Sequence, residues 1–543
     1  MKKRILRLIA LLLVCTLLTG CGENLKIYTE SLIDFLGEKV SGDVVTYEEM
    51  VYTRPDMDTL EATLNQVLDA AAGEDFDRII DGIWEFYDVY DLFFTHYALA
   101  DIRYSGDLTD SYWEEEYDFC SENSPRVSAM LEELYYALAK SPCLEQLESD
   151  EYFGAGYFDS YQGENNWDDA FTALLEAESD LISRYYEISR LAGDYETGSE
   201  EYYDVCFQDA AQLLVELILL RREIAAYWDY EDYSQFATDY YHYRDYSTEE
   251  SRAYLDQVRT ELVDLYRQMN GSGIWENGFD YTSESETYAY VEEMARAMGG
   301  TVAEAFDAMD QGGLYDIGYG KNKYPSSFEI YLPAYYVPFI FMSPALTTYD
   351  HLTFAHEFGH FCNDYASYQS YAGVDVLEFF SQGMEYLSLC YVNGTEQLTK
   401  MKMADSLCLY VEQSAFASFE MRMYEIPEEE LTVETLTELY EQVATEYGFE
   451  SISYDPREFV TINHYYTNPL YILSYVVSND AAMQLYQLEK NRPGSGLAVL
   501  EENLATEEYY FLSFLESAGL ESPFAEGRLQ KVRQTFSEVL GSV

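Results

Sequence analysis

The segment 347-TTYDHLTFAHEFGHFCNDY-365 decides how the rest of the chain is interpreted. A threonine pair supplies N-cap candidates and Asp350 follows in the first turn, which predicts the start of a helix. On that helix His356 and His360, two of only six histidines in the chain, lie four residues apart on one face. Two imidazoles at this spacing can bind one zinc ion. The segment therefore predicts a metal site on a helix.

Glu357 lies next to the first histidine and is turned by only about 60° from His360 around the helix axis. It is therefore placed to take a proton from the water molecule that a zinc ion activates. The alternative is an ordinary amphipathic helix with two histidines packed in its core. An H-E-x-x-H motif arises by chance in roughly one such sequence per hundred, and Gly359 permits the close approach of another element. We therefore favour the metal site.

A catalytic zinc site needs a third protein ligand and an open fourth position. Asp364 is on the histidine face, but it lies one turn too far along the axis to be a ligand. The segment 374-VDVLEFFSQGMEYL-387 predicts a second helix, one face of which carries Glu378, Ser381, Gln382 and Glu385. Glu378 is the better ligand candidate, and Ser381 and Glu385 would orient the ligands from behind. The alternative is a polar stripe on a buried helix.

These two segments resemble the oligoendopeptidase F and thimet oligopeptidase family of zinc metallopeptidases. In that family the first glutamate of an E-x-x-S-x-x-x-E motif is the third zinc ligand, and it corresponds to Glu378. The chain departs from the family pattern at Asn363, which stands where a histidine commonly follows the zinc motif. The resemblance covers about residues 205–540 and includes 221-RREIAAYWDYEDYSQFA-237, which is similar to the family's helical entry to the catalytic half.

A third segment, 464-HYYTNPLYILSY-475, is similar to the family's H-F-Y-x-x-x-F-Y-x-Y-x-Y motif, which lines the cleft opposite the metal. His464, Tyr471 and Tyr475 match the motif, and the resemblance implies that they contact the substrate. Leu473 stands where the family usually has a tyrosine. By the same resemblance, zinc and the Tyr475 hydroxyl, helped by His464, would stabilise the developing oxyanion.

The resemblance also implies a mostly α-helical, two-lobed, clam-like fold with one zinc ion per chain deep in a central channel. Residues 21–200 would form a helical N-terminal lobe and residues 201–543 the zinc-metallopeptidase catalytic domain. The implied activity is that of an endopeptidase that cleaves short, unfolded oligopeptides, with Glu357 as the base. Two alternatives remain open: a carboxypeptidase or dipeptidyl carboxypeptidase on the same scaffold, and a catalytically inactive peptide-binding lipoprotein. The intact set of four site residues argues against the inactive protein.

The segment 327-SFEIYLPAYYVPFIFMSP-344 breaks the helical pattern. Its β-branched and aromatic residues, interrupted by Pro333 and Pro338, predict one or two short strands near the zinc site. Proline within a strand is tolerated mainly at a sheet edge. An exposed edge at this place would suit the docking of an extended peptide. A simple hairpin that covers the core is the alternative, and the two remain open.

The N-terminal segment 1-MKKRILRLIALLLVCTLLTGC-21 begins with basic residues, continues with a short apolar core and ends in a lipobox-like cysteine. This order predicts a bacterial lipoprotein signal peptide over residues 1–20 and lipidation of Cys21. The protein would then be anchored to the membrane at the extracytoplasmic cell surface through Cys21. A plain secretory signal with a chance cysteine is the alternative. No other stretch is long and apolar enough to span a membrane.

The chain has 31 Lys and Arg against 100 Asp and Glu, a net charge of −69. Removal of residues 1–20 takes away four basic residues and no acidic one, so the mature chain would carry −73. Such a charge argues against nucleic acid and anionic lipid as partners. High solubility is the ordinary explanation, and attraction of basic oligopeptides is the functional one. Six further cysteines without a C-x-x-C pair are expected to be mostly buried free thiols, with a disulfide left open: Cys120, Cys143, Cys206, Cys362, Cys390 and Cys408.

Overall fold

The computed structural model describes residues 46–149, 152–162, 169–192, 195–276, 278–370, 372–506 and 508–541. The predicted signal peptide and Cys21 lie outside these ranges. Within them, no helix has both the length and the apolar character that are needed to cross a membrane. The six cysteines that follow Cys21 are all free thiols, and four of them are buried, as predicted.

Most of the described chain is helical, which confirms the predicted fold class. The helices are α3 (Met57–Ala71), α4 (Phe76–Gly106), α5 (Ser111–Leu138), α6 (Leu144–Leu147), α7 (Asp169–Ala192), α8 (Glu200–Tyr227), α9 (Tyr233–Phe236), α10 (Thr248–Glu261), α11 (Val263–Asn270), α12 (Glu284–Met298), α13 (Gly300–Gly312), α14 (Tyr349–Ser367), α15 (Val374–Tyr391), α16 (Glu396–Cys408), α17 (Ser414–Met423), α18 (Val433–Glu446), α19 (His464–Thr467), α20 (Ile472–Asn491), α21 (Ser495–Asn503), α22 (Phe511–Ser517) and α23 (Arg528–Leu540). The strands are β1 (Tyr315–Ile317), β2 (Ser327–Leu332) and β3 (Val337–Met342).

Local sequence signals explain where many of these helices begin. The side chain of Asp56 accepts hydrogen bonds from two backbone N–H groups in the first turn of α3. Ser247 and Ser283 form capping boxes with glutamates three residues later, at the starts of α10 and α12. Each cap satisfies backbone donors that the helix itself leaves unpaired. The helix starts are therefore set locally, whereas packing decides which face is buried.

The three strands form one small sheet in the order β1-β3-β2. β3 is parallel to β1 and antiparallel to β2, and the β2–β3 pair runs from Ser327 opposite Met342 to Leu332 opposite Val337. Pro338 therefore lies in the central strand rather than in an edge strand. It is tolerated there because β1 pairs only with residues 340–342 of β3, beyond the proline. The segment thus forms two strands, within the predicted range.

Two buried hydrophobic clusters lie within the fold. The smaller one is formed by residues between Leu60 and Tyr161, in α3 to α6 and the segment that follows them. The larger one contains Phe171 of α7 and most of the buried residues that follow it. The division does not fall at one point in the chain, because Ala98, Leu99 and Ile102 near the C-terminal end of α4 belong to the larger cluster. The lobe boundary predicted at residue 200 stays a prediction.

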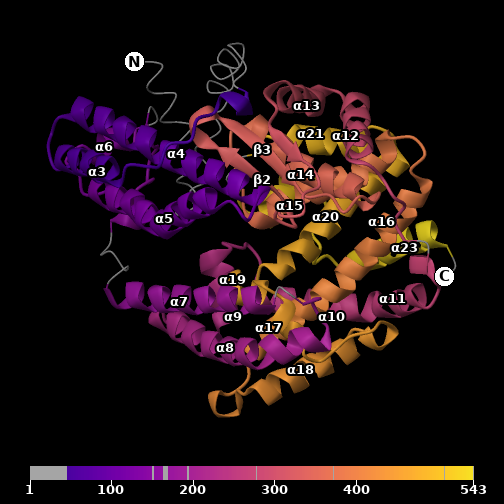
Figure 1. Ribbon diagram of the computed structural model, residues 1–543. Coiled ribbons are helices and arrows are strands. Elements are labelled where there is room, and N and C mark those ends of the chain that lie inside the picture. The colour runs from indigo at the N-terminus through magenta and orange to yellow at the C-terminus, as the bar shows by residue number, and fades with distance from the viewer. Residues whose placement is uncertain are drawn as a thin grey trace.

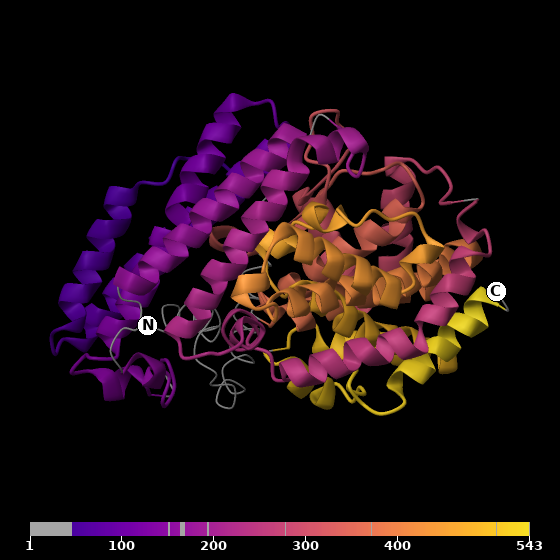
Figure 2. The same ribbon diagram turned by 90° about the horizontal axis from the view of Figure 1, so that it is seen from below.

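Helices from distant parts of the sequence form the two halves of the molecule (Figure 1). In that view α7, α8, α17 and α18 form the lower half, while the sheet, α12, α14 and α15 lie in the upper half. Seen from below, the N-terminal helices stand at one side of the helices around α20 (Figure 2). This arrangement confirms the predicted two-lobed architecture, with the small sheet packed against α14 and α4.

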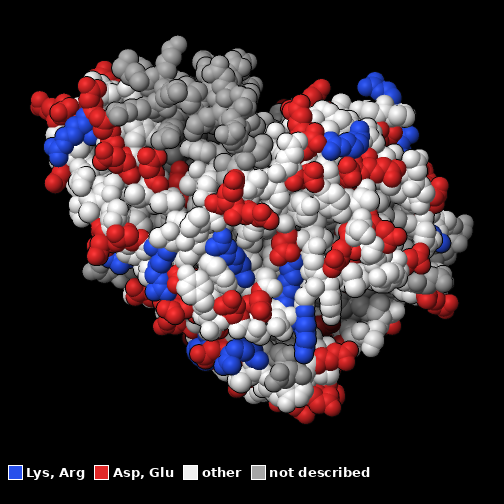
Figure 3. Space-filling view, turned by 45° about the horizontal axis from the view of Figure 1, so that its top comes forward, with Lys and Arg blue, Asp and Glu red and all other residues white. Residues whose placement is uncertain are grey.

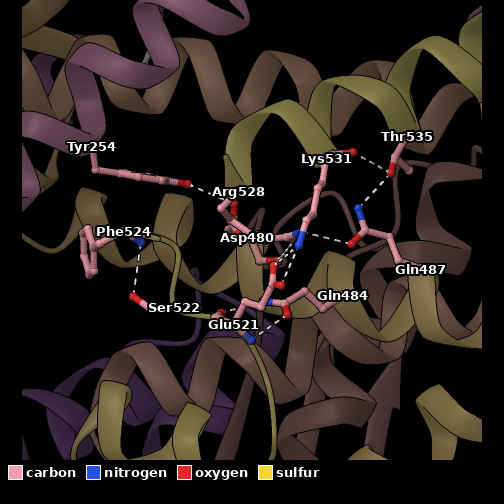
Figure 4. A network of polar contacts seen from close by, with 10 residues as sticks. All are labelled: Tyr254, Asp480, Gln484, Gln487, Glu521, Ser522, Phe524, Arg528, Lys531 and Thr535. Atoms are coloured by element: carbon pink, nitrogen blue, oxygen red, sulfur yellow. Dashed lines mark hydrogen bonds and ion pairs between the residues drawn. The ribbon is translucent and has the colours of Figure 1, made fainter. Parts of the chain in front are cut away.

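Helix α20 is fixed in the upper half by buried polar contacts with α23 (Figure 4). The guanidinium of Arg528 donates to the Asp480 carboxylate over 2.5 Å and to the Asp480 backbone carbonyl over 2.9 Å. Both side chains are almost completely buried. Removal of one partner from a buried charge pair of this kind is strongly destabilising, because the other charge is left buried without compensation. The C-terminal helix therefore holds the position of α20.

Candidate metal and active site

Helix α14 carries the H-E-x-x-H motif, and its start differs in detail from the prediction. Thr348 is the N-cap residue, but its side chain makes no capping hydrogen bond. Asp350 instead accepts the backbone N–H groups of Ala345 and Thr347 at 3.0 and 3.1 Å. The carboxylate in the first turn thus fixes the entry of the chain into the helix, where a negative charge is also favoured by the helix dipole.

Helix α15 lies unusually close to α14 because Gly359 has no side chain. A Cβ atom at this position would be 2.5 Å from the carbonyl oxygen of Phe380 and 2.6 Å from the Cα of Ser381. Real Cβ atoms do not approach other atoms so closely, so only glycine allows this helix packing. The close approach was anticipated from the motif, and it brings α15 within reach of the two histidines.

His356, His360 and Glu378 come together between the two helices. One donor atom from each of them lies within 4.8 Å of the other two. The Nε2 atom of His356 is 3.6 Å from a carboxylate oxygen of Glu378. Two imidazoles and one carboxylate are a donor set that suits a catalytic zinc ion with an open fourth position. The residues present therefore fit the predicted metal.

Two neighbours orient the carboxylate of Glu378. The hydroxyl of Ser381 donates to one of its oxygens over 3.1 Å, and the hydroxyl of Tyr471 donates to the other over 3.1 Å. Ser381 was predicted in this orienting role. Tyr471 was predicted only as a substrate contact, because spacing along one helix cannot indicate a hydrogen bond between α15 and the residue just before α20.

A chain of polar contacts runs away from the site behind His356. Its Nδ1 atom is 2.8 Å from Glu385, and the other oxygen of Glu385 is 2.6 Å from Nζ of Lys402 on α16. Although burial lowers the pKa of His356, the hydrogen bond to Glu385 and the charge of Glu378 raise it to about 9. The sequence analysis did not identify Lys402. The one feature that could have indicated it is its position four residues after Leu398, which is buried, and therefore on the same face of α16.

Glu357 is buried beside the histidines, with only 7% of its surface exposed. Burial and the charges of Glu378 and Glu385, against the opposing effect of His356, raise its pKa to about 7. The backbone N–H of Glu329 in β2 donates a hydrogen bond to it. A carboxyl group whose pKa lies near neutrality is suited to both accept and return a proton at neutral pH.

Asp364 is buried on α14 outside the metal-binding group. Its carboxylate accepts the backbone N–H of Ser370 over 2.6 Å and is hydrogen-bonded to the carboxyl group of Glu329. Burial raises the pKa of Asp364 to about 7. Asp364 is not a member of the group of three possible metal ligands, and the expectation that it is no ligand stays a prediction.

The third motif places an aromatic cluster opposite the metal-binding group. The ring of His464, in α19, lies 5.5 Å from Tyr471 and 5.8 Å from Tyr475 between centroids. Burial lowers the pKa of His464, which favours the neutral ring at pH 7. Burial, followed by the charge of Glu378, raises the pKa of Tyr475, so its hydroxyl keeps its proton. The three predicted residues thus lie together.

Three buried side chains that were not among the predicted site residues hold this aromatic segment: Arg221, Arg244 and Glu420. Arg221 donates to two backbone carbonyls just after His464, at 2.5 and 2.6 Å. Leu470 has a positive φ of 64°, which is strained for a leucine. Its N–H donates to Glu420 over 2.8 Å and its carbonyl accepts from Arg244 over 2.9 Å. These contacts stabilise the backbone bend directly before Tyr471.

Comparison with known proteins shows similarity at two levels. Residues 47–166 match the family model of the Peptidase M3 N-terminal domain. A crystal structure of a candidate oligoendopeptidase F is similar with a TM-score of 0.76 and 20% identity, and PZ peptidase A with an inhibitor gives 0.77 and 19%. A candidate oligoendopeptidase F from Bacillus anthracis str. Ames gives 0.74 and 20%. Each comparison covers 92% of this chain and 99% of the other. No curated protein matches the chain.

These findings confirm the predicted resemblance and the fold. The family model matches the N-terminal region, which lies outside the range of about residues 205–540 that the sequence resemblance covers. The solved structures extend the likeness in fold over nearly the whole chain.

Proposed function

We propose that this chain, which has an M3 peptidase N-terminal domain and the fold of oligoendopeptidase F, is a zinc-dependent endopeptidase that hydrolyses short, unfolded oligopeptides. The comparisons support a peptidase of the M3 kind. The observation that carries the zinc mechanism is the group of three donor atoms within 4.8 Å of one another, with the buried Glu357 beside it. We place the substrate in the predicted channel between the two halves.

His356, His360 and Glu378 would hold the zinc ion, which when bound polarises the scissile carbonyl and acidifies water. Glu357 accepts the proton of the attacking water and then returns it to the leaving amine. Its pKa of about 7 suits both steps. Glu385 and Ser381 do not touch the substrate. They keep the imidazole of His356 and the carboxylate of Glu378 in the orientation that ligation requires.

The protonated hydroxyl of Tyr475 is the donor that we assign to the oxyanion of the tetrahedral transition state. His464 packs edge-on against its ring and supports it. Tyr471 has a double role in this proposal: its hydroxyl donates to Glu378 and its ring borders the substrate. Leu473, in place of the tyrosine usual in the family, is fully buried in α20 and takes no part in substrate binding.

The test combines metal analysis with a peptide digest. Purified protein should contain about one zinc ion per chain, His360→Ala should lose it, and Asp364→Asn should keep it as the matched control on the same helix. The zinc-loaded protein should cleave a mixed peptide library internally, as read by mass spectrometry, and C-terminal amidation should not slow it. A strict need for a free C-terminal carboxylate would establish a carboxypeptidase instead, and an intact library would contradict the peptidase.

We also propose that the protein is a lipoprotein, held at the outer side of the bacterial membrane through Cys21. The order of basic residues, apolar core and cysteine supports this. Cys21→Ser should release the protein from membranes or leave its precursor unprocessed. A processed Cys21→Ser protein that still fractionates with membranes would contradict the anchor.

A further inference from the structure

The contacts behind His356 form a continuous path through three helices. Nδ1 of His356, on α14, contacts one oxygen of Glu385, on α15, and Nζ of Lys402, on α16, contacts the other. The Nε2 atom of His356 is then the one left to face Glu378. The orientation of the imidazole therefore depends on where the Glu385 carboxylate is held.

Glu385 has two oxygens and two partners, and it is buried between them. The side chains of Glu385 and Lys402 are exposed by only 9% and 2%. A buried carboxylate is costly unless a nearby charge and hydrogen bonds compensate it. Among the ion pairs of the described residues, Lys402 is the only lysine or arginine partner of Glu385.

Lys402 is itself fixed by its surroundings. Its Nζ lies 5.1 Å from the centroid of the Tyr386 ring, a distance at which a cation is attracted to the ring face. The Tyr386 hydroxyl is held in turn by Ser406 over 2.8 Å and Asn479 over 2.9 Å. The ammonium group thus has a defined position, from which it can hold the Glu385 carboxylate in one orientation.

We propose that Lys402 is a positioning residue for the metal site: it holds Glu385 in place, and Glu385 holds His356 in the orientation that binds zinc. This inference rests on the proposed function. A direct partner of a metal ligand, as Glu385 is of His356, typically contributes about 10- to 100-fold to metal affinity, and this is the contribution that Lys402 would secure. Lys402 does not touch the substrate or the reacting atoms, and it acts only through Glu385.

Zinc affinity, measured by competition with a chelator, tests the proposal. Lys402→Met keeps the length of the side chain and removes its charge, and it should weaken zinc binding by about 10- to 100-fold. Lys400→Met is the matched control, because Lys400 lies on the same helix with its side chain exposed, and it should bind zinc like the wild type. Equal affinity of the two variants would overturn the proposal.

Two further variants separate positioning from folding, because Lys402→Met leaves a buried carboxylate without its counter-charge. In Glu385→Gln the orienting charge is absent, so adding Lys402→Met should weaken zinc binding no further. Independent, multiplying effects of the two substitutions would overturn the path through Glu385. In cobalt-substituted protein the visible absorption bands should change in Lys402→Met and not in Lys400→Met, and unchanged bands would count against the proposal.

These measurements also distinguish the proposal from the proposed function. If the wild-type protein binds no zinc, the proposed metal site itself is contradicted. Wild-type protein that binds zinc tightly, together with a Lys402→Met variant that binds it equally well, would leave the function standing and remove the role of Lys402.

Discussion

At the residue scale, Glu357 combines burial and a pKa of about 7 with a place beside the metal-binding group. Glu357→Gln should keep the fold and the zinc ion but lower kcat by about 10²- to 10⁴-fold, because an amide cannot accept the proton of water. Metal analysis and thermal unfolding would serve as controls in the same preparation. Turnover within tenfold of the wild type would remove Glu357 from the mechanism.

Gly359 makes a different kind of contribution, since it permits the short distance between α14 and α15 and takes no part in the reaction. Gly359→Ala should cost about 1–3 kcal/mol of unfolding free energy, because its Cβ would clash with the backbone of α15. Zinc binding should weaken as the helices move apart. Gly106→Ala is the control, since its Cβ would meet its nearest neighbour at 4.0 Å. Equal stability of the two variants in chemical denaturation would show that α14 and α15 adjust freely.

The site residues divide according to the kind of signal that can reveal them. His356 and His360 follow from spacing along a single helix, and Glu378 follows from the polar face of the next one. Lys402 and Glu420 could not be found in this way. Their roles arise from contacts between helices that are distant in sequence, and a lysine or glutamate on a helix is ordinarily an exposed residue.

At the scale of elements, the segment from α19 to α20 depends on buried charges. Burial raises the pKa of Glu420 to about 8, against the opposing effects of the Leu470 N–H and of Arg221 and Arg244. In the unfolded chain this pKa is close to 4.5. The folded state therefore binds more protons between these values, and its stability falls as pH rises through that window.

Glu420→Gln should remove this fall in stability at high pH, because glutamine still accepts the Leu470 N–H but carries no charge. Relative to the wild type, the variant should be more stable at pH 9 than at pH 5. Each pKa unit is worth about 1.4 kcal/mol, so the difference should reach a few kcal/mol at most. Thermal unfolding of both proteins at the two pH values measures it. A stability difference that does not change with pH would show that Glu420 keeps an ordinary pKa in the fold.

The strands show what a local pattern can predict about an element. The composition of residues 327–344 indicated strands and their turn, and β2 and β3 occupy that range. The central place of β3 could not be predicted, since it depends on β1, a three-residue strand without a clear pattern. The expectation that a proline marks a sheet edge therefore holds only for the part of β3 that does not pair with β1, which contains Pro338.

At the scale of the whole molecule, acidity is the dominant surface property. Acidic side chains are spread over most of the face seen in Figure 3, whereas basic ones gather in a few groups. Peptides with Lys or Arg beside the scissile region should therefore be captured faster than acidic ones. Steering by charge can change on-rates by about 10- to 10³-fold. The difference should appear in kcat/KM and shrink as salt rises.

Matched quenched fluorescent peptides that differ only in flanking Lys or Glu would measure this preference at low and high salt. Intact casein and a stably folded domain serve as controls for substrate size. Equal rates at low salt would confine the acidity to solubility. Rapid cleavage of the folded domain would contradict a site that lies between two halves.

The arrangement of the halves could be predicted only through the family resemblance. Helical periodicity indicates helices and their buried faces, but the larger hydrophobic cluster joins residues from α4 to α23. Which of these faces meet depends on the whole set of packing contacts. For the same reason the sequence does not show that the two ends of α4 belong to different hydrophobic clusters.

The pair of Asp480 and Arg528 also bears on the order of assembly. Asp480 lies on the helix that carries Tyr475, and its partner follows 48 residues later in the chain. While a ribosome or a translocon still holds that later segment, α20 has a carboxylate with no counter-charge to bury it against. The aromatic side of the active site would then be fixed only after α23 has joined the fold. We expect a growing chain to acquire its zinc ligands before it acquires the ability to cut, so an unfinished peptidase would be harmless to its neighbours.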